Sequence, residues 1–198
     1  MNEFPFPDKM TSIKILESDY VYPKIPKNDV QKIFDRVWSL GEQYGQELIK
    51  TTLIGEKWKM SDVLKDINIR IEESKADNVV KNQRYFCEFF PKQNCLTIYK
   101  KSVQLWCHAN ALEYDIGVET ILSHEYFHYL EWKSGKLVSG MFTVPVIKIG
   151  KLRLGKTGIP SLSEVAANAF SKIYYEYIRQ QMMCEKGGKD VSVFQNNK

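Results

Sequence analysis

The chain contains one short motif whose residue types can hold a metal ion, His124-Glu125-Tyr126-Phe127-His128. The two histidines are four residues apart, so on an α-helix their side chains lie one turn apart on the same face. Neutral imidazole is a good ligand for Zn²⁺. Glu125 lies beside such a metal rather than on it, where its carboxylate can act as general base towards a water whose pKa the metal lowers. The motif therefore predicts a zinc site with His124 and His128 as ligands and Glu125 as the catalytic base.

The alternative interpretation is an ordinary core helix that carries two polar residues on one face. The chain has only three histidines, so a chance pairing of two of them around a glutamate at this spacing is rare. The neighbours Ile121, Leu122 and Phe127 are apolar, and imidazoles without a ligand would be buried polar groups in need of partners. We therefore favour the metal site.

A catalytic zinc site needs a third protein ligand, and a structural site needs a fourth. The candidates are Asp115, Glu119, Glu131, His108 and Glu164. Asp115 and Glu119 precede the motif and are typical of residues that cap a helix or complement its dipole. Glu131 follows the second histidine on the same helix, so reaching back to the metal would strain its side chain. A lone histidine such as His108 is more often a hydrogen-bonded structural residue.

Glu164 is the candidate with the most informative neighbours. In Glu164-Val165-Ala166-Ala167-Asn168-Ala169-Phe170, a Glu and an Asn are four residues apart, and small alanines would let two helices approach closely. Together with the HExxH motif, this segment resembles the gluzincin class of zinc metallopeptidases, and within it the compact ImmA/IrrE-like family. The resemblance covers about residues 83–183. It implies His124, His128 and Glu164 as the ligands of one Zn²⁺ ion, Glu125 as the catalytic base, and Asn168 as a residue that fixes a ligand histidine.

Glu164 also has a purely local interpretation. Ser161-Leu162-Ser163-Glu164 is an S-x-x-E capping box, in which the carboxylate folds back onto the backbone at the helix start. Capping and metal ligation would point the carboxylate in different directions. The segment between His128 and Glu164 is longer than in the compact relatives, which makes residues 134–160 an insertion. Its glycines and its apolar and basic runs predict a hairpin, which either borders the functional cleft or has no role there.

Hydrophobic periodicity predicts the elements that must position these residues. We expect helices from residue 28 or 29, at 61–67, at 102–112 and from 161 to about 184. Strands are expected at 69–71, 84–90 and 95–99, the last two as a hairpin, with a polar loop at 74–82. The metal helix should begin after a break at Asp115-Ile116-Gly117 and end near Gly135.

The predicted fold class is α+β. It places a small antiparallel or mixed sheet against the HExxH helix and a second ligand-bearing helix, with an N-terminal helical segment. Residues 29–185 form a single zincin-like domain in this interpretation. Residues 1–28, rich in proline and aromatics, are predicted to be an extended N-terminal arm, and residues 186–198 a flexible tail.

Composition argues against several classes of protein. A chain of 198 residues with 43% hydrophobic and 13% aromatic residues suits one domain. The net charge is only +4 and no basic cluster is interleaved with aromatics, so nucleic-acid binding is not indicated. No apolar run approaches the ~18 residues of a membrane span. The N-terminus does not resemble a signal peptide and the four cysteines form no C-x-x-C pair, so we expect a cytoplasmic protein with reduced thiols.

The predicted function is zinc-dependent hydrolysis of peptide bonds in a protein or peptide substrate. Glu125 would take the proton of the attacking water and pass it to the leaving amine. His108, Tyr174 and Tyr175 are the candidate donors to the oxyanion. An extended substrate could pair with the edge strand of the sheet. The alternative, from another class, is a metal-bearing interaction or regulatory protein without catalysis, which a fourth protein ligand would favour.

Overall fold

The computed structural model describes residues 3–53, 58–81, 83–150 and 152–192. Its elements, in chain order, are α1 (Lys9–Glu17), η1 (Tyr22–Lys24), α2 (Lys27–Thr51), α3 (Met60–Asp66), β1 (Arg70–Ser74), β2 (Asn78–Val80), β3 (Gln83–Tyr85), β4 (Cys87–Phe90), η2 (Pro91–Gln93), β5 (Cys95–Tyr99), α4 (Lys100–Ala109), α5 (Tyr114–Ser134), η3 (Val138–Gly140), β6 (Ile147–Ile149), β7 (Leu152–Leu154) and α6 (Ser161–Ser192).

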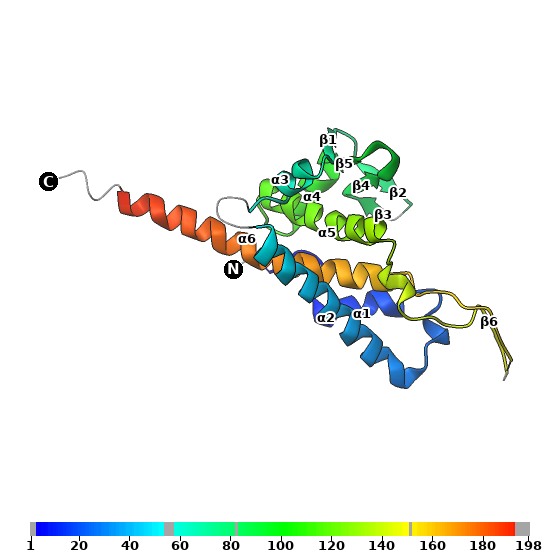
Figure 1. Cartoon of the computed structure of the whole chain (residues 1–198). Coiled ribbons are helices and arrows are strands. Elements are labelled where there is room, and N and C mark those ends of the chain that lie inside the picture. The colour runs from blue at the N-terminus through cyan, green and yellow to red at the C-terminus, as the bar shows by residue number, and fades with distance from the viewer. Residues whose placement is uncertain (1–2, 54–57, 82, 151, 193–198) are drawn as a thin grey trace.

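The HExxH helix, α5, lies between a small sheet and a layer of helices (Figure 1). The sheet has the order β1-β5-β4, with β1 parallel and β4 antiparallel to β5. It touches α5 through β4, while α6 packs on the other side of α5 and against α2. Because α5 is covered from both sides, its apolar residues Ile121, Leu122 and Phe127 are all buried. The α+β prediction is confirmed, and the sheet is mixed.

Small residues hold α2 and α6 at close range. A Cβ atom added to Gly41 in α2 would lie 2.2 Å from the backbone oxygen of Ala166 in α6, and one added to Gly45 would lie 2.9 Å from Cβ of Ile173. A larger residue at either glycine would force the helices apart. This packing fixes the position of α6, and therefore of Glu164 in its first turn.

The predicted break before the metal helix is wrong, because α5 begins at Tyr114 and Gly117 lies inside it. Gly117 serves helix packing instead: an added Cβ would lie 2.2 Å from Sγ of Cys107 in α4. The predicted loop at 74–82 also contains β2, which pairs with β3 in an antiparallel ribbon. The β4–β5 hairpin and a hairpin within the insertion, β6–β7, are confirmed.

The prediction of an extended arm over residues 1–28 is wrong for its middle part, which forms α1. The helix begins after Asp8, whose side chain accepts a hydrogen bond from the backbone N–H of Thr11 at 2.9 Å. Residues 8–22 contain no proline, so nothing prevents helix formation there. Leu16 and Val21 are fully buried, which makes this segment part of the core rather than an arm laid over it.

The C-terminal prediction also needs correction. The α6 backbone continues to Ser192, past the glycine pair at 187–188 where a flexible tail was expected to begin, and residues 193–198 lie outside the described part. Each glycine costs about 1 kcal/mol of helix propensity, but a helix that is already nucleated gains a hydrogen bond for each residue added. Among the described residues, no helix is both long and apolar enough to cross a lipid bilayer.

Candidate metal centre

The two histidines of the motif project from one face of α5, as their spacing predicts. Their Nε2 atoms are 3.2 Å apart, and the ring centroids are separated by 4.9 Å. His124 and His128 are both partly buried. The four-residue spacing on this helix therefore places two imidazole nitrogens close enough to bind one ion.

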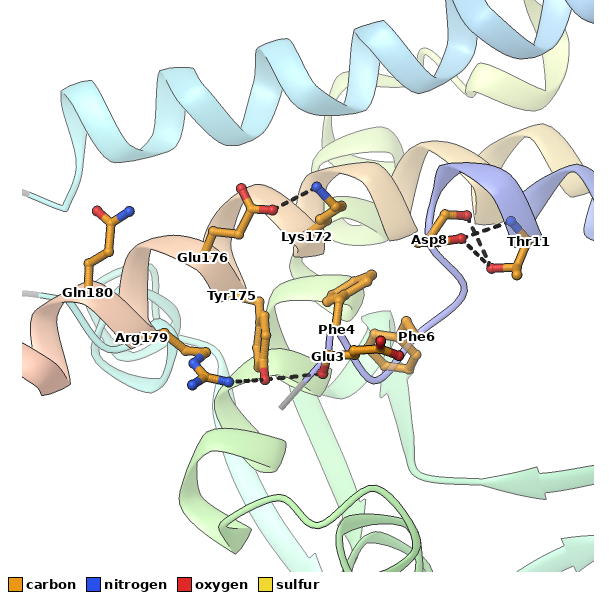
Figure 2. Close-up of a pocket in the computed structure, with 10 residues that line it drawn as sticks. All are labelled: Glu3, Phe4, Phe6, Asp8, Thr11, Lys172, Tyr175, Glu176, Arg179 and Gln180. Carbon is orange, nitrogen blue, oxygen red and sulfur yellow. Dashed lines mark hydrogen bonds and ion pairs between the residues drawn. The ribbon is translucent and has the colours of Figure 1, made fainter. Parts of the chain in front are cut away.

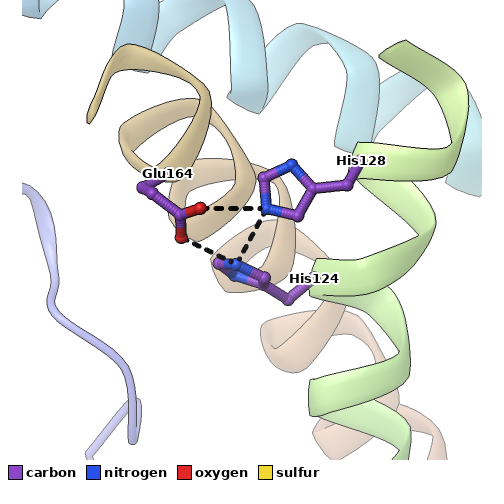
Figure 3. Close-up of side chains that lie close together, drawn as sticks. All are labelled: His124, His128 and Glu164. Atoms are coloured by element: carbon purple, nitrogen blue, oxygen red, sulfur yellow. Dashed lines mark hydrogen bonds and ion pairs between the residues drawn. The ribbon is translucent and has the colours of Figure 1, made fainter. Parts of the chain in front are cut away.

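Glu164, in the first turn of α6, faces the two histidines (Figure 3). Its Oε2 atom is 3.2 Å from Nε2 of His124, and its Oε1 atom is 3.4 Å from Nε2 of His128. The capping-box interpretation is wrong, because the carboxylate is turned towards the histidines. The backbone N–H of Ser161 donates instead to Asp19 Oδ2 at 2.8 Å, so the segment between α1 and η1 caps α6.

The distances within this triad suit a shared metal ion. Nε2 of His124 lies 3.2 Å from Nε2 of His128 and 3.2 Å from Oε2 of Glu164, while Nε2 of His128 lies 3.4 Å from the other carboxylate oxygen, Oε1. One ligand atom from each residue can be chosen so that all three lie within 4.8 Å of one another. His124, His128 and Glu164 are thus close enough to hold a metal ion. Within the described residues this group has three members, so a four-coordinate ion held there would have one position for another molecule.

Glu131 contacts His128 on the ring nitrogen that points away from the triad. Its Oε2 atom lies 3.1 Å from Nδ1 of His128, and its Oε1 atom accepts hydrogen bonds from Val138 N (2.7 Å) and Ser163 Oγ (2.8 Å). A carboxylate only accepts, so Nδ1 carries a proton. When the ring is neutral, the lone pair is then on Nε2, the atom that faces the centre. Sequence reasoning weighed Glu131 only as a ligand and missed this role. A carboxylate three residues after the second histidine is the signal that could have found it.

The charges of the triad make the centre attractive for a cation. Burial alone would lower the pKa of His128, but its hydrogen bonds to Glu131 and Glu164 outweigh burial and raise the pKa to about 10. Hydrogen bonds from His124 and His128 hold the pKa of Glu164 far below its usual value. The two shifts share the contact between the Glu164 carboxylate and the imidazoles, which favours a negative charge on Glu164 and a positive charge beside it.

Glu125 lines the same cleft beside the two histidines, as expected for a general base. It is only partly exposed. Burial raises its pKa, opposed by the neighbouring charges of His124 and His128. A carboxylate with a raised pKa is a better proton acceptor than a solvated one, which suits general base chemistry near neutral pH.

A cleft of about 700 Å³ opens over the triad. Its walls come from α5, α6, the N-terminal segment at Phe6 and Pro7, and residues 84–91 around β4. Within the described part, β4 pairs only with β5, so its other edge is free. Phe89 of β4 packs its ring on Tyr129 and Trp132 of α5, each with centroids 5.8 Å apart. An edge strand thus runs beside the metal centre.

The N-terminal segment reaches the centre, which sequence reasoning did not predict. The ring of Phe6 lies 5.2 Å from that of His124 and 5.0 Å from that of Trp106. Phe6 also borders a second cavity of about 610 Å³ on the other side of the segment, between residues 3–11 and α6 (Figure 2). It therefore separates the two cavities.

The remaining predicted site residues lie elsewhere, with one exception. Asn168 is buried and lines the cleft, but no hydrogen bond joins it to either histidine, and Nδ1 of His124 lacks a partner among the described residues. His108 is exposed on α4. Tyr174 is buried against Glu119, at 3.2 Å, and Tyr175 accepts a hydrogen bond from Arg179 in the second cavity (Figure 2).

None of His108, Tyr174 and Tyr175 lines the metal cleft, so their prediction as oxyanion donors is wrong. Helix periodicity alone cannot tell which face of α4 or α6 turns towards the metal. The insertion at 134–160 does not line the cleft either, within the described residues. The insertion contacts the site indirectly, because the backbone N–H of Val138 donates a hydrogen bond to Glu131, which in turn contacts His128.

No protein-family model, curated protein or solved structure matches this chain significantly.

Proposed function

We propose that the protein is a zinc metallopeptidase of the gluzincin type, similar to the compact ImmA/IrrE-like family, that hydrolyses peptide bonds of a protein or peptide substrate. The observation that carries this proposal is the triad of His124, His128 and Glu164, whose ligand atoms all lie within 4.8 Å of one another. Glu125 beside it supplies the carboxylate that hydrolysis requires.

Zinc suits the donor set of two imidazoles and one carboxylate, which also occurs in other catalytic zinc sites. When bound, Zn²⁺ supplies Lewis acidity that polarises a carbonyl oxygen and acidifies a water. With three protein ligands among the described residues, a bound zinc ion would keep an open position, as catalytic sites do and closed structural sites do not. This favours the peptidase over the alternative of a metal-bearing protein without catalysis.

Glu125 is the proton carrier in the proposed reaction. It accepts a proton from the attacking water and returns it to the nitrogen of the leaving amine, so its charge is the same before and after one turnover. Glu131 keeps Nδ1 of His128 protonated and the ring fixed, which leaves Nε2 available as a ligand.

The free edge of β4 is the proposed site for the substrate backbone. An extended peptide that adds to this edge would pair with residues 87–90 by main-chain hydrogen bonds and run along the cleft past Glu125. Phe6 and Trp132 would then form apolar walls around its side chains. We further propose a cytoplasmic protein, in keeping with the free thiols of Cys87, Cys95 and Cys107.

The test combines metal analysis with a cleavage assay. Protein purified without chelator is analysed for zinc and incubated with a library of quenched fluorescent peptides, with and without a chelator and added Zn²⁺. We expect one zinc ion per chain and cleavage that the chelator abolishes and zinc restores. Glu125→Gln should keep the zinc and lose the cleavage. A chain that contains no metal and takes none up would refute the proposal.

A further inference from the structure

The β6–β7 hairpin extends away from the helical body (Figure 1). Its base is fixed by reciprocal backbone hydrogen bonds between Val144 and Thr157, both 2.9 Å, and by Lys24 Nζ, which donates to the backbone oxygen of Val146 at 2.7 Å. The hairpin is therefore anchored at its base, while its strands have no other strand beside them in the described part.

One face of this hairpin is apolar and exposed. Ile147 and Leu154 are cross-strand partners, and Leu152 is two residues from Leu154, so the three side chains share a face. Their exposed fractions are 47%, 49% and 53%. These aliphatic residues thus leave about half of their surface exposed to solvent. Their position favours a partner outside the chain.

The charge around the hairpin is one-sided. Residues 133–163 contain six basic residues and no acidic residue: Lys133, Lys136, Lys148, Lys151, Arg153 and Lys156. The net charge of the whole chain is +4, so the rest of the chain carries a slight excess of acidic residues. Arg153 lies between Leu152 and Leu154 in β7, on the opposite face of the ribbon, and is exposed.

We propose that the β6–β7 hairpin docks the protein on an anionic lipid surface. The aliphatic face enters the boundary between head groups and acyl chains, and the basic residues contact the negatively charged head groups. This role goes beyond peptide hydrolysis and does not depend on it, because the hairpin does not line the metal cleft among the described residues.

Two features favour lipid over a protein partner. A stable protein interface needs about 800 Å² on each partner and is usually anchored by aromatic residues. The strands of this hairpin have three residues each and contain no aromatic residue. A lipid surface demands no shape complementarity, and its negative charge complements the exposed basic residues Arg153 and Lys156 of the hairpin.

The experiment measures co-sedimentation of the full chain with vesicles. Phosphatidylcholine vesicles are compared with vesicles that contain about 30 mol % phosphatidylserine, at about 0.1 and 0.5 M salt. The hairpin variants are Leu152→Ser with Leu154→Ser, and Arg153→Glu with Lys156→Glu. The matched controls are Val79→Ser with Val80→Ser, on the other exposed ribbon (47% and 52% exposed), and Lys27→Glu with Lys50→Glu on α2. Circular dichroism checks that every variant is folded.

We expect the wild type to sediment with the anionic vesicles and to be released by the higher salt. Each hairpin variant should lose about tenfold or more in partitioning, from lost apolar burial or reversed charge, while the controls bind as the wild type does. Absence of binding to anionic vesicles would overturn the proposal, as would equal binding by the hairpin variants. Binding of poly-glutamate in place of vesicles, lost in the same variants, would overturn it in favour of an acidic protein partner.

Discussion

Glu131 offers the sharpest test of how the metal centre is built, because it is not a ligand. It is 5% exposed and bonds three groups, His128 Nδ1, Val138 N and Ser163 Oγ. In Glu131→Gln the shape is kept and the charge is removed. The amide oxygen must remain with Val138 and Ser163, because turning the amide round would set its NH₂ group against the backbone N–H of Val138, which can only donate.

The amide NH₂ of the variant then faces Nδ1 of His128. Nδ1 can only accept from it, so the proton of the neutral ring moves to Nε2, the atom that should bind the metal. Loss of such a partner typically weakens metal binding by about 10–100-fold, which is about 1.4–2.7 kcal/mol. We expect a loss in this range for Glu131→Gln.

The assay is competition for Zn²⁺ with a chromophoric chelator at fixed pH, with urea unfolding of the metal-free protein as a measure of the fold. Glu176→Gln is the matched control, because Glu176 is a half-exposed residue paired with Lys172 on α6. It should bind zinc as the wild type does. If folded Glu131→Gln binds zinc within twofold of the wild type, the reasoning about the histidine tautomer is refuted.

Three further predictions concern the base, the capping of α6 and the helix packing. Glu125→Gln should retain zinc but lose peptide cleavage by about 10²–10⁴-fold, measured as kcat/KM; full residual cleavage would remove Glu125 from the base role. Asp19→Asn should destabilise the fold by about 1 kcal/mol, because both carboxylate oxygens accept backbone hydrogen bonds, from Ser161 and Val21, and an amide has only one oxygen to accept them. Burial would raise the pKa of Asp19, but its hydrogen bonds to backbone N–H groups lower it below 3.8. The stabilisation by the ionised carboxylate is therefore fully present above this pH and is lost as the pH falls through the lowered pKa. Urea unfolding should show a smaller difference in stability between wild type and variant at pH 3 than at pH 7. Gly41→Ala should destabilise by about 1–3 kcal/mol, because its Cβ would lie 2.2 Å from a backbone oxygen of α6. Gly140→Ala, where an added Cβ meets nothing within 4 Å, is the control, and equal urea midpoints for the two variants would contradict the packing argument.

The sequence alone determined the two histidines of the candidate metal centre. Spacing along a helix places His124 and His128 on one face, because helix geometry depends only on residues within one turn. Apolar periodicity likewise predicted α2, α5 and α6 and the α+β class, since each element must bury one face. The predicted helix break at Gly117 failed because this glycine is needed for packing between helices. Its missing side chain leaves space for Cys107 of α4.

Only the tertiary structure decided which residues meet the two histidines. From the sequence, Glu164 could either cap its own helix or bind the metal. The packing of α6 against α5 and α2 turns it towards the histidines, and Asp19 accepts the hydrogen bond from the start of α6 in its place. The tertiary structure also decided the role of Glu131, whose partner Val138 lies beyond the end of α5, and the contact of Phe6 with His124. These contacts join segments far apart in the chain. Their geometry is fixed by the packing of the whole core, which no local pattern records.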